Sequence, residues 1–195
     1  MPLAALSLLA LLLLSLHSPG VGAMSVLPSF FAREAVEAAE SGEDPVIVDY
    51  DRLIADKVLV KKAERRLYLL KDDKPFRSYK VSLGSDPVGH KERKGDGRTP
   101  EGQYVLTWRN PKSQFRKALH ISYPSVADRL RAERLGVNPG GLIAIHGQPR
   151  PNQHRDLQEL IRGEDWTQGC VAVSDMEIDE IWQFTLEGTP IEILP

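Results

Sequence analysis

The amino-acid sequence predicts a mainly β or α+β domain. Short apolar runs alternate with turn-forming residues along most of the chain, and 14 prolines and 15 glycines suit strands and loops better than a helical bundle. The 195 residues are 42% hydrophobic and 27% charged, which is ordinary for a globular protein. A chain of this length buries a sizeable core without disulfides. We therefore expect one domain, or a small domain plus a tail, built from strands with a few helices.

The first part of this domain is predicted to be a β-meander that begins at residue 57. Its apolar and β-branched runs are separated by residues 71–75 (KDDKP), which have the composition of a turn. The stretch 84–102 that follows is rich in glycine, proline and charge, and it predicts a long loop. The strands of the meander are predicted at 58–60, 66–70 and 76–83.

The rest of the domain is predicted to contain both strands and helices. Helical spacing of apolar residues indicates the helices, whereas short apolar runs indicate buried strands. The predicted strands are 103–108, 118–122, 142–145, 170–173 and 190–194. The predicted helices are 125–135, 154–162 and 175–186, with another at 28–40 nearer the N-terminus.

The N-terminal segment is expected to be a secretory signal peptide, residues 1–23. Residues 3–16 are almost wholly apolar, yet this run is shorter than the roughly 20 residues that span a bilayer. Small residues at 21–23 predict cleavage after Ala23, and a retained N-terminal membrane anchor is the alternative. We therefore expect an exported protein, periplasmic or associated with the cell wall. Residues 24–56 are expected to form an N-terminal helical segment ahead of the domain.

Charge and cysteine content exclude several classes of protein. The net charge is −2, from 25 Lys+Arg against 27 Asp+Glu, which argues against nucleic-acid binding through bulk positive charge. The basic residues of 91–98 are interspersed with Glu92 and Asp96, so they predict no nucleic-acid patch either. Cys170 is the single cysteine, which excludes an intramolecular disulfide and a multi-cysteine zinc site. No metal is expected.

Two short motifs concentrate the chemistry. In 141–147 (GLIAIHG) a buried-type strand ends at His146 and is followed by Gly147. In 165–173 (DWTQGCVAV) a turn delivers Cys170 to the start of another buried-type strand. Taken alone, each residue is also compatible with an inert buried cysteine or a hydrogen-bonded core histidine. Together they indicate a cysteine nucleophile with a histidine base.

A cysteine nucleophile sets two structural requirements. The thiolate is the reactive form, so a base must lie within hydrogen-bond reach, and backbone N–H groups must face the oxyanion of a tetrahedral intermediate. Gly169 leaves the backbone before Cys170 free to adopt a tight turn. His146 and Cys170 are 24 residues apart, so they can meet only if their strands are neighbours in a sheet.

These motifs resemble the signature of the L,D-transpeptidase catalytic domain, the YkuD-like fold. IAIHG and TQGCVAV resemble its HG and [S/T]-x-G-C elements, and GDGRTPEGQY at 95–104 resembles its T-P-x-G block. The YafK-like branch is similar in HISYPS, DWTQGCVAVSDMEIDEIW and EGTPIEILP. The resemblance covers 57–195, which would be the catalytic domain. It implies a β-sandwich-like mixed sheet with a few peripheral helices, with the cysteine at the rim and no metal or organic cofactor.

The resemblance also implies roles for individual residues. Cys170 would form a thioester with a peptidoglycan stem peptide, and His146 would be its general base. The carbonyl of Gly147 would orient the imidazole, and the backbone around Gly169 and Cys170 would supply the oxyanion donors. The bond attacked would join the L-centre of a diamino acid to a D-amino acid. An amine acceptor would then give a crosslink or a protein attachment, whereas water would give hydrolysis.

Two positions depart from the common pattern of that family. Gln168 stands where many members have histidine, and Ala172 stands where many have arginine. Both departures are compatible with the YafK-like branch, for which a hydrolytic activity that releases protein from peptidoglycan is an established possibility. Three hypotheses follow: an L,D-transpeptidase, a hydrolase on the same fold that frees a peptide or a wall-attached lipoprotein, and a non-catalytic wall-binding relative.

Four residues are candidates for substrate binding. Arg98 and Arg150 have the side chain that binds a carboxylate in bidentate fashion, with a solvated loop charge as the alternative. His120 is expected to line the cleft or to be a structural histidine. Gln168, next to the glycine–cysteine pair, completes this set.

Overall fold

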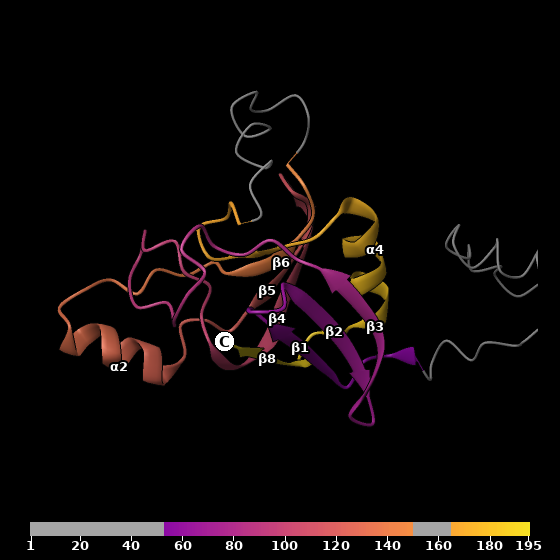
Figure 1. Ribbon diagram of the computed structural model, residues 1–195, viewed down its shortest axis with the longest axis horizontal. Helices are drawn as coiled ribbons and strands as arrows, with labels where there is room; N and C mark the ends of the chain where they lie inside the picture. The colour runs from indigo at the N-terminus through magenta and orange to yellow at the C-terminus, as the bar shows by residue number, and fades with distance from the viewer. Residues whose placement is uncertain (1–52, 150–164) are drawn as a thin grey trace, which may run out of the picture. The chain divides into compact units, whose positions relative to one another are not determined.

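One mixed sheet organises the described part of the chain, residues 53–149 and 165–195, in this computed structural model (Figure 1). Within those residues its eight strands follow the order β3-β2-β1-β8-β4-β5-β6-β7. The strands are β1 (Lys57–Lys61), β2 (Arg66–Lys71), β3 (Lys74–Lys80), β4 (Gly102–Ser113), β5 (Arg116–Ile121), β6 (Ala144–His146), β7 (Val171–Ala172) and β8 (Pro190–Leu194). The helices described are α2 (Val126–Arg134) and α4 (Asp175–Phe184). The predicted fold class, mainly β or α+β with a mixed sheet, is confirmed.

The predicted meander forms one half of the sheet. β1, β2 and β3 pair antiparallel, and β8 joins β1 in parallel. The turn between β2 and β3 is tighter than predicted, because only Asp72 and Asp73 adopt left-handed backbone angles and strand pairing resumes at Lys74. The predicted strand 76–83 ends at Lys80, and Ser82 forms an isolated bridge with Ala172 instead. This bridge links the segment that follows the meander to β7, the strand that follows Cys170.

β4 is twice as long as the predicted strand 103–108 and joins the two halves of the sheet. Its first residues pair with β8, and from Leu106 onward it pairs with β5. The extension to Ser113 contains Pro111 and two register shifts, which removed the alternating pattern from the sequence. The length of the β4–β5 hairpin was therefore underestimated. This hairpin forms one wall of the candidate site.

The histidine-bearing and cysteine-bearing strands are neighbours, which is the condition for His146 and Cys170 to meet. β6 and β7 pair in parallel, with Ile145 opposite Val171 and His146 opposite Ala172. The predicted strand 142–145 was wrong at its start, because Leu142 has φ +57° and is 78% exposed. That left-handed residue ends the extended conformation, so β6 begins at Ala144.

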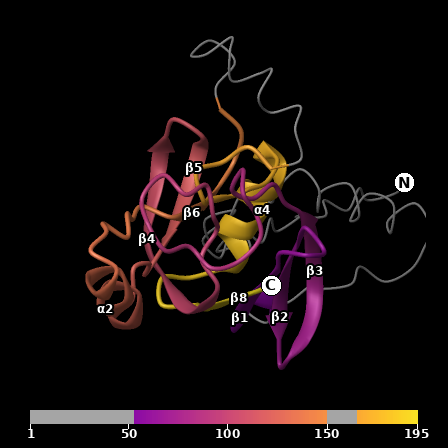
Figure 2. The same ribbon diagram turned by 60° about the vertical axis from the view of Figure 1, so that its left-hand side comes forward.

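The two described helices have similar caps but different packing. Ser174 and Glu177 form a capping box at the start of α4, which buries Ile178, Ile181 and Phe184. Ser125 and Asp128 form the same motif at the start of α2. The helix predicted at 125–135 is present, but α2 buries only Asp128 and Ala132. The two helices lie apart in both ribbon views (Figures 1 and 2).

The long loop predicted at 84–102 is confirmed between β3 and β4. It is fastened to β1 by Lys62, whose side chain is only 2% exposed. The Lys62 ammonium group donates to Glu101 at 2.7 Å and to the carbonyls of Gly89 and Thr99 at 2.6 and 3.1 Å. One buried lysine thus holds both ends of this loop.

Three sequence predictions lie outside the described residues: the signal peptide, the helix at 28–40 and the helix at 154–162. No helix in the described ranges has the length and apolar character needed to cross a membrane.

Candidate active site

The turn that carries Cys170 is hydrogen-bonded to the segment leaving the meander. Thr167 exchanges backbone hydrogen bonds with Leu83 and Ser85, both at 3.0 Å. The carboxylate of Asp165 accepts from the Leu83 N–H at 2.9 Å and pairs with Arg65 at 2.8 Å. These bonds fix the start of the turn against the segment that follows β3. The thiol therefore sits on a rigid support.

Gly169 is required by the shape of this turn. Its φ of +124° is disfavoured for other residues, and a Cβ there would lie 2.5 Å from the carbonyl oxygen of Arg98. Thr167 Oγ1 closes the turn by accepting from the Gly169 N–H at 3.1 Å and donating to the Cys170 carbonyl at 2.8 Å. The sequence resemblance implied that the backbone around Gly169 and Cys170 supplies the oxyanion donors, and the structure limits this role to one of their two N–H groups. The Gly169 N–H already has an acceptor, which leaves the Cys170 N–H as the donor available for this role.

Gly169→Ala is expected to lower the free energy of unfolding by about 2 kcal/mol or more and to reduce activity, because both the backbone angle and the Arg98 carbonyl oppose a side chain. Urea unfolding measures the first effect. Gly188→Ala is the matched control, since Gly188 also has a positive φ, +87°, but has no atom within 4 Å of its added Cβ. Equal losses of stability and activity in both variants would contradict the role of this close approach.

His146 ends β6 with its imidazole held in one orientation. Its side chain is 3% exposed, and Nδ1 lies 2.7 Å from the Gly147 carbonyl oxygen. A carbonyl only accepts, so Nδ1 carries the proton and Nε2 is left as the basic nitrogen. Burial lowers the pKa of His146 to about 4, although the Gly147 carbonyl opposes this shift. The imidazole is therefore neutral at neutral pH and able to accept a proton.

Gly147 must also be glycine for this arrangement. A Cβ there would lie 2.6 Å from the Asp175 carboxylate and 3.0 Å from the Ile178 side chain, both on α4. The neighbouring Gln148 N–H donates to the same Asp175 carboxylate at 2.8 Å. The first turn of α4 thus holds the end of the histidine strand. The Gly147 carbonyl stands where the sequence resemblance expected it.

Two aromatic rings enclose the imidazole. Phe115 stacks on His146 with ring centroids 4.4 Å apart, and Trp166 meets it edge-on at 5.8 Å. Trp166 is buried against the imidazole. Sequence reasoning missed Phe115, which lies in the turn between β4 and β5. No motif or spacing relates that turn to the histidine strand.

Strand register places the cysteine and the histidine on one face of the sheet. His146 is opposite Ala118 on β5 and Ala172 on β7, and Ala144 is opposite His120. Cys170 precedes Ala172 by two residues, and residues two apart on a strand share a face. Small alanine side chains therefore lie between and beside the two reactive groups.

A cavity of about 460 Å³ opens on this face. Its lining includes Cys170, His146, His120, Phe115, Trp108 and Lys112. The β4–β5 hairpin contributes one wall, and the segment before β6 contributes exposed Leu142 at the mouth. Cys170 and His146 thus line one cavity, with the thiol hydrogen-bonded to the Leu142 carbonyl rather than to the imidazole.

The thiol of Cys170 is half-buried and protonated in its resting environment. It donates weakly to the Leu142 carbonyl, with a sulfur–oxygen distance of 3.7 Å. Burial raises the pKa of Cys170, while the Ala144 N–H and the charge of Lys91 oppose that shift. The resting pair is therefore a neutral thiol beside a neutral imidazole.

The candidate substrate residues separate into two groups. His120 lines the cavity, where it stacks on Trp108 with centroids 3.9 Å apart, and burial lowers its pKa. Arg98 does not line the cavity, because its guanidinium pairs with Asp86 at 3.1 Å. The Gln168 side chain is exposed and also lies outside the cavity lining. Arg150 lies outside the described residues.

Lys112 is a cation that sequence reasoning missed. It lies on β4 and lines the cavity, and in the described residues no ion pair engages its ammonium group. The cavity also holds no group of three or more histidine, cysteine and carboxylate side chains suited to a metal, nor does any other part of the described ranges. Besides Lys112 and His120, the cavity lining offers the polar side chains of Asn110, Ser113 and Gln114 for recognition.

A mixed sheet that presents one cysteine and two histidines to a common cavity defines a class of β-rich cysteine–histidine domains. A family model for the L,D-transpeptidase catalytic domain matches residues 55–193. The chain belongs to this family.

Two relatives illustrate the similarity. YafK of Escherichia coli (strain K12) is 34% identical over 110 residues, which are 55% of this chain and 36% of YafK. The crystal structure of the helical cell shape determining protein Pgp2 from Campylobacter jejuni superposes with a TM-score of 0.53 and 26% identity, over 70% of this chain and 46% of Pgp2. The chain thus spans less than half the length of these proteins. The resemblance to the YafK-like branch is confirmed.

Proposed function

We propose that this protein is an L,D-transpeptidase that acts on peptidoglycan stem peptides through a Cys170 thioester. The observation that carries the proposal is the common cavity of Cys170 and His146, with Nδ1 of the histidine fixed by Gly147. Membership of the L,D-transpeptidase family supports the substrate class. The similarity to a cell shape determining protein supports a role in remodelling the cell wall.

The proposed reaction begins with proton transfer from the Cys170 thiol to Nε2 of His146. Sulfur then bonds to the carbonyl carbon, and the Cys170 N–H donates to the oxyanion. The C–N bond breaks, and the leaving amine takes the proton from His146. An acceptor amine then attacks the thioester, the C–S bond breaks, and the thiol regains its proton through His146. Atoms and charges balance in each half, and no cofactor takes part.

Hydrolysis is the second candidate, and the openness of the site favours it. Cys170 is partly accessible to solvent, and Trp108 and Leu142 at the cavity mouth are exposed. Water therefore reaches the position of the thioester unless an acceptor covers it. In that case the enzyme would trim a stem peptide or free a wall-attached protein, such as a lipoprotein. A non-catalytic wall-binding role has no support from a site that retains both reactive groups.

Lys112 is the residue proposed to meet a substrate carboxylate. The stem peptide is acidic, and Lys112 places an ammonium group on the wall of the cavity. This role replaces the one expected of Arg98, which is paired with Asp86. We also propose that the protein works outside the cytoplasm, because stem peptides are assembled into the wall there and the apolar segment 3–16 has the composition of an export signal.

Incubation of the full chain with a disaccharide-tetrapeptide, with and without an amine acceptor, tests the proposal by intact-protein mass spectrometry. We expect a mass gain that maps to Cys170 and is missing from Cys170→Ala. Exchanged or crosslinked product would identify a transpeptidase, and trimmed product alone would identify a hydrolase. The absence of both adduct and product with tetrapeptide and protein-linked fragments would overturn the proposed function.

A further inference from the structure

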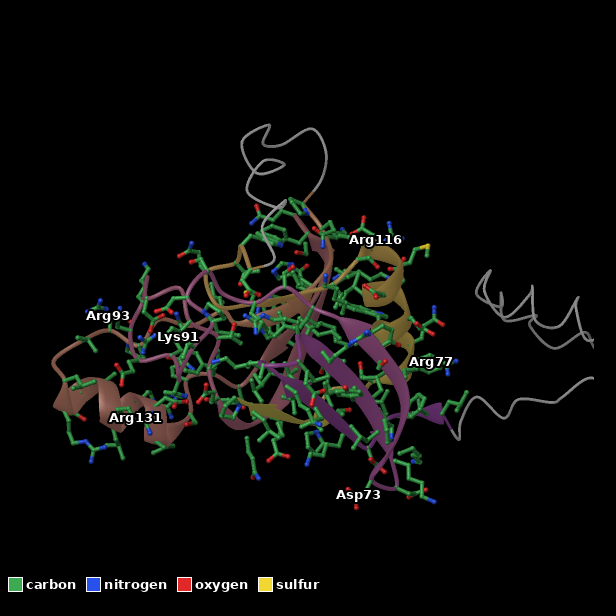
Figure 3. All side chains as sticks on the ribbon, in the orientation of Figure 1. Asp73, Arg77, Lys91, Arg93, Arg116 and Arg131 are labelled. Carbon is green, nitrogen blue, oxygen red and sulfur yellow. The ribbon has the colours of Figure 1, made fainter. Side chains whose placement is uncertain are left out.

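Lys91 is a buried cation next to the cysteine turn that the reaction above does not use. Its side chain is only 3% exposed, although it belongs to the 84–102 loop. Its ammonium group donates to Asp96 at 2.7 Å and to the Gln168 carbonyl at 3.4 Å. Figure 3 shows Arg93 at the outer edge of this region and Lys91 nearer to the strands. Gln168 immediately precedes the glycine–cysteine pair, so Lys91 bonds to the turn that carries the thiol.

Asp96 keeps the Lys91 ammonium in place. Its carboxylate accepts from the backbone N–H groups of Glu92, Arg93 and Arg98, at 2.8, 3.0 and 3.1 Å. Burial acts to raise the pKa of Asp96, but these donors and Lys91 lower it to about 2. The loop is thus folded around an ionised carboxylate, which orients Lys91 toward the cysteine turn.

Lys91 also lies near the segment that leads into the histidine strand. A Cβ at Gly140 would lie 3.7 Å from the Lys91 side chain, and the neighbouring Lys94 N–H donates to the Asn138 carbonyl at 2.7 Å. The side chain therefore lies where three segments meet: the loop, the cysteine turn and the approach to β6. Such a position couples the loop to both halves of the candidate site.

The chemistry of the site calls for positive charge near the sulfur. The resting thiol and imidazole are both neutral, and attack requires negative charge to develop on sulfur in a half-buried place. The titratable groups facing Cys170 are His146 from β6, His120 from β5 and Lys112 from β4. Burial lowers the pKa of both histidines, and Lys112 is exposed to solvent that screens its charge. The buried Lys91 is screened least.

We propose that Lys91 is a positioning residue for Cys170, which holds the turn through the Gln168 carbonyl and supplies positive charge beside the sulfur. The proposal rests on the proposed function only in treating Cys170 as the nucleophile. Asp96 balances the charge of Lys91, but its carboxylate is bonded to the loop backbone, whereas the Lys91 ammonium group is the partner that bonds to the cysteine turn. The field at the sulfur is therefore that of an oriented pair with its positive end toward the cysteine turn.

The test is the pH dependence of Cys170 alkylation by iodoacetamide, followed by intact-protein mass spectrometry between pH 6 and 10. We expect Lys91→Met to move the midpoint of the alkylation curve to higher pH and to slow alkylation at pH 7 by roughly threefold or more. Lys91→Arg keeps the charge and should restore most of the reactivity. Alkylation needs no peptidoglycan, so its outcome is independent of whether the proposed substrate is right.

Lys62→Met is the matched control. Lys62 is equally buried, is paired with a carboxylate and fastens the same loop, but it bonds to Gly89, Thr99 and Glu101 rather than to the cysteine turn. It should lower the melting temperature without moving the alkylation midpoint. An unchanged midpoint in Lys91→Met, or an equal shift in Lys62→Met, would overturn the proposal.

Asp96→Asn keeps the proposal falsifiable if Lys91→Met fails to fold. The amide oxygen can still accept from the Glu92 and Arg93 N–H groups, which now donate to Oδ2, while the negative charge beside Lys91 is removed. The alkylation midpoint should then move to lower pH, opposite to the effect of Lys91→Met. A midpoint that stays constant or rises in Asp96→Asn would contradict an electrostatic action of Lys91 on the sulfur.

Discussion

Replacing Cys170 by alanine is expected to abolish acyl transfer, with a loss of at least about 10⁴-fold in kcat/KM. No other cysteine exists in the chain, so no second thiol can form the acyl intermediate. The cavity and His146 would remain, but an imidazole beside a methyl group has no proton to accept. Quantifying stem-peptide products by mass spectrometry over long incubations measures the residual rate.

The same variant is expected to keep its fold, which makes the loss of activity interpretable. Cys170 is half-buried just before β7, and its sulfur makes only weak hydrogen bonds, with the Leu142 carbonyl at 3.7 Å and with the Ala144 N–H. A change of this size costs on the order of 1 kcal/mol or less. Thermal unfolding should therefore give a melting temperature near that of the wild type. Product formation at the wild-type rate by folded Cys170→Ala would show that another group is the nucleophile.

Replacing His146 by glutamine is expected to lower kcat by about 10²- to 10⁴-fold, because the general base is lost. The pH dependence gives a sharper test than the magnitude. Burial lowers the pKa of His146 to about 4, so the basic form persists down to that pH. Wild-type activity should therefore fall only as the pH drops through about 4, and the glutamine variant should lack this acidic limb. A wild-type limb near pH 6.5 would contradict a buried, neutral histidine.

The free energy of unfolding of the wild type and of His146→Gln should respond differently to acidic pH. In the unfolded chain His146 takes up a proton near its ordinary pKa of about 6.5, whereas the folded protein resists protonation until about 4. The contribution of neutral His146 to the free energy of unfolding is therefore fully present above pH 6.5. It decreases as the pH falls from 6.5 toward 4, by up to roughly 3 kcal/mol in all. Urea unfolding at pH 7 and pH 4.5 should show a smaller loss for His146→Gln than for the wild type. If the wild type and His146→Gln lose the same free energy of unfolding between pH 7 and pH 4.5, groups other than His146 cause the sensitivity to acid.

Local patterns were sufficient for the elements that alternate cleanly. The closing strand predicted at 190–194 coincides with β8, and the helices begin at the caps Ser125 and Ser174. The elements predicted poorly have sequence patterns broken by tertiary contacts. β4 continues through Pro111 because β5 pairs with it, and β6 starts late because Leu142 takes a left-handed conformation.

The candidate site divides in the same way. Cys170, His146 and Gly147 carry recognisable motifs, so their identity and the pairing of their strands could be predicted. Trp108 and Phe115 come from a hairpin far away in sequence, and no local pattern marks them. Arg98 was a candidate for substrate binding, but its side chain pairs with Asp86 and does not line the cavity.

The sequence by itself determined the family, the mainly β class and the two groups that can carry the reaction, because these follow from local motifs and periodicity. The tertiary structure decided which side chains surround them. It placed Lys91 beside the cysteine turn, gave the Gly169 N–H an acceptor and left Lys112 on the cavity wall. The physical reason is that burial and electrostatic fields depend on distances between segments far apart in the chain, and strand register and loop packing set those distances only on folding.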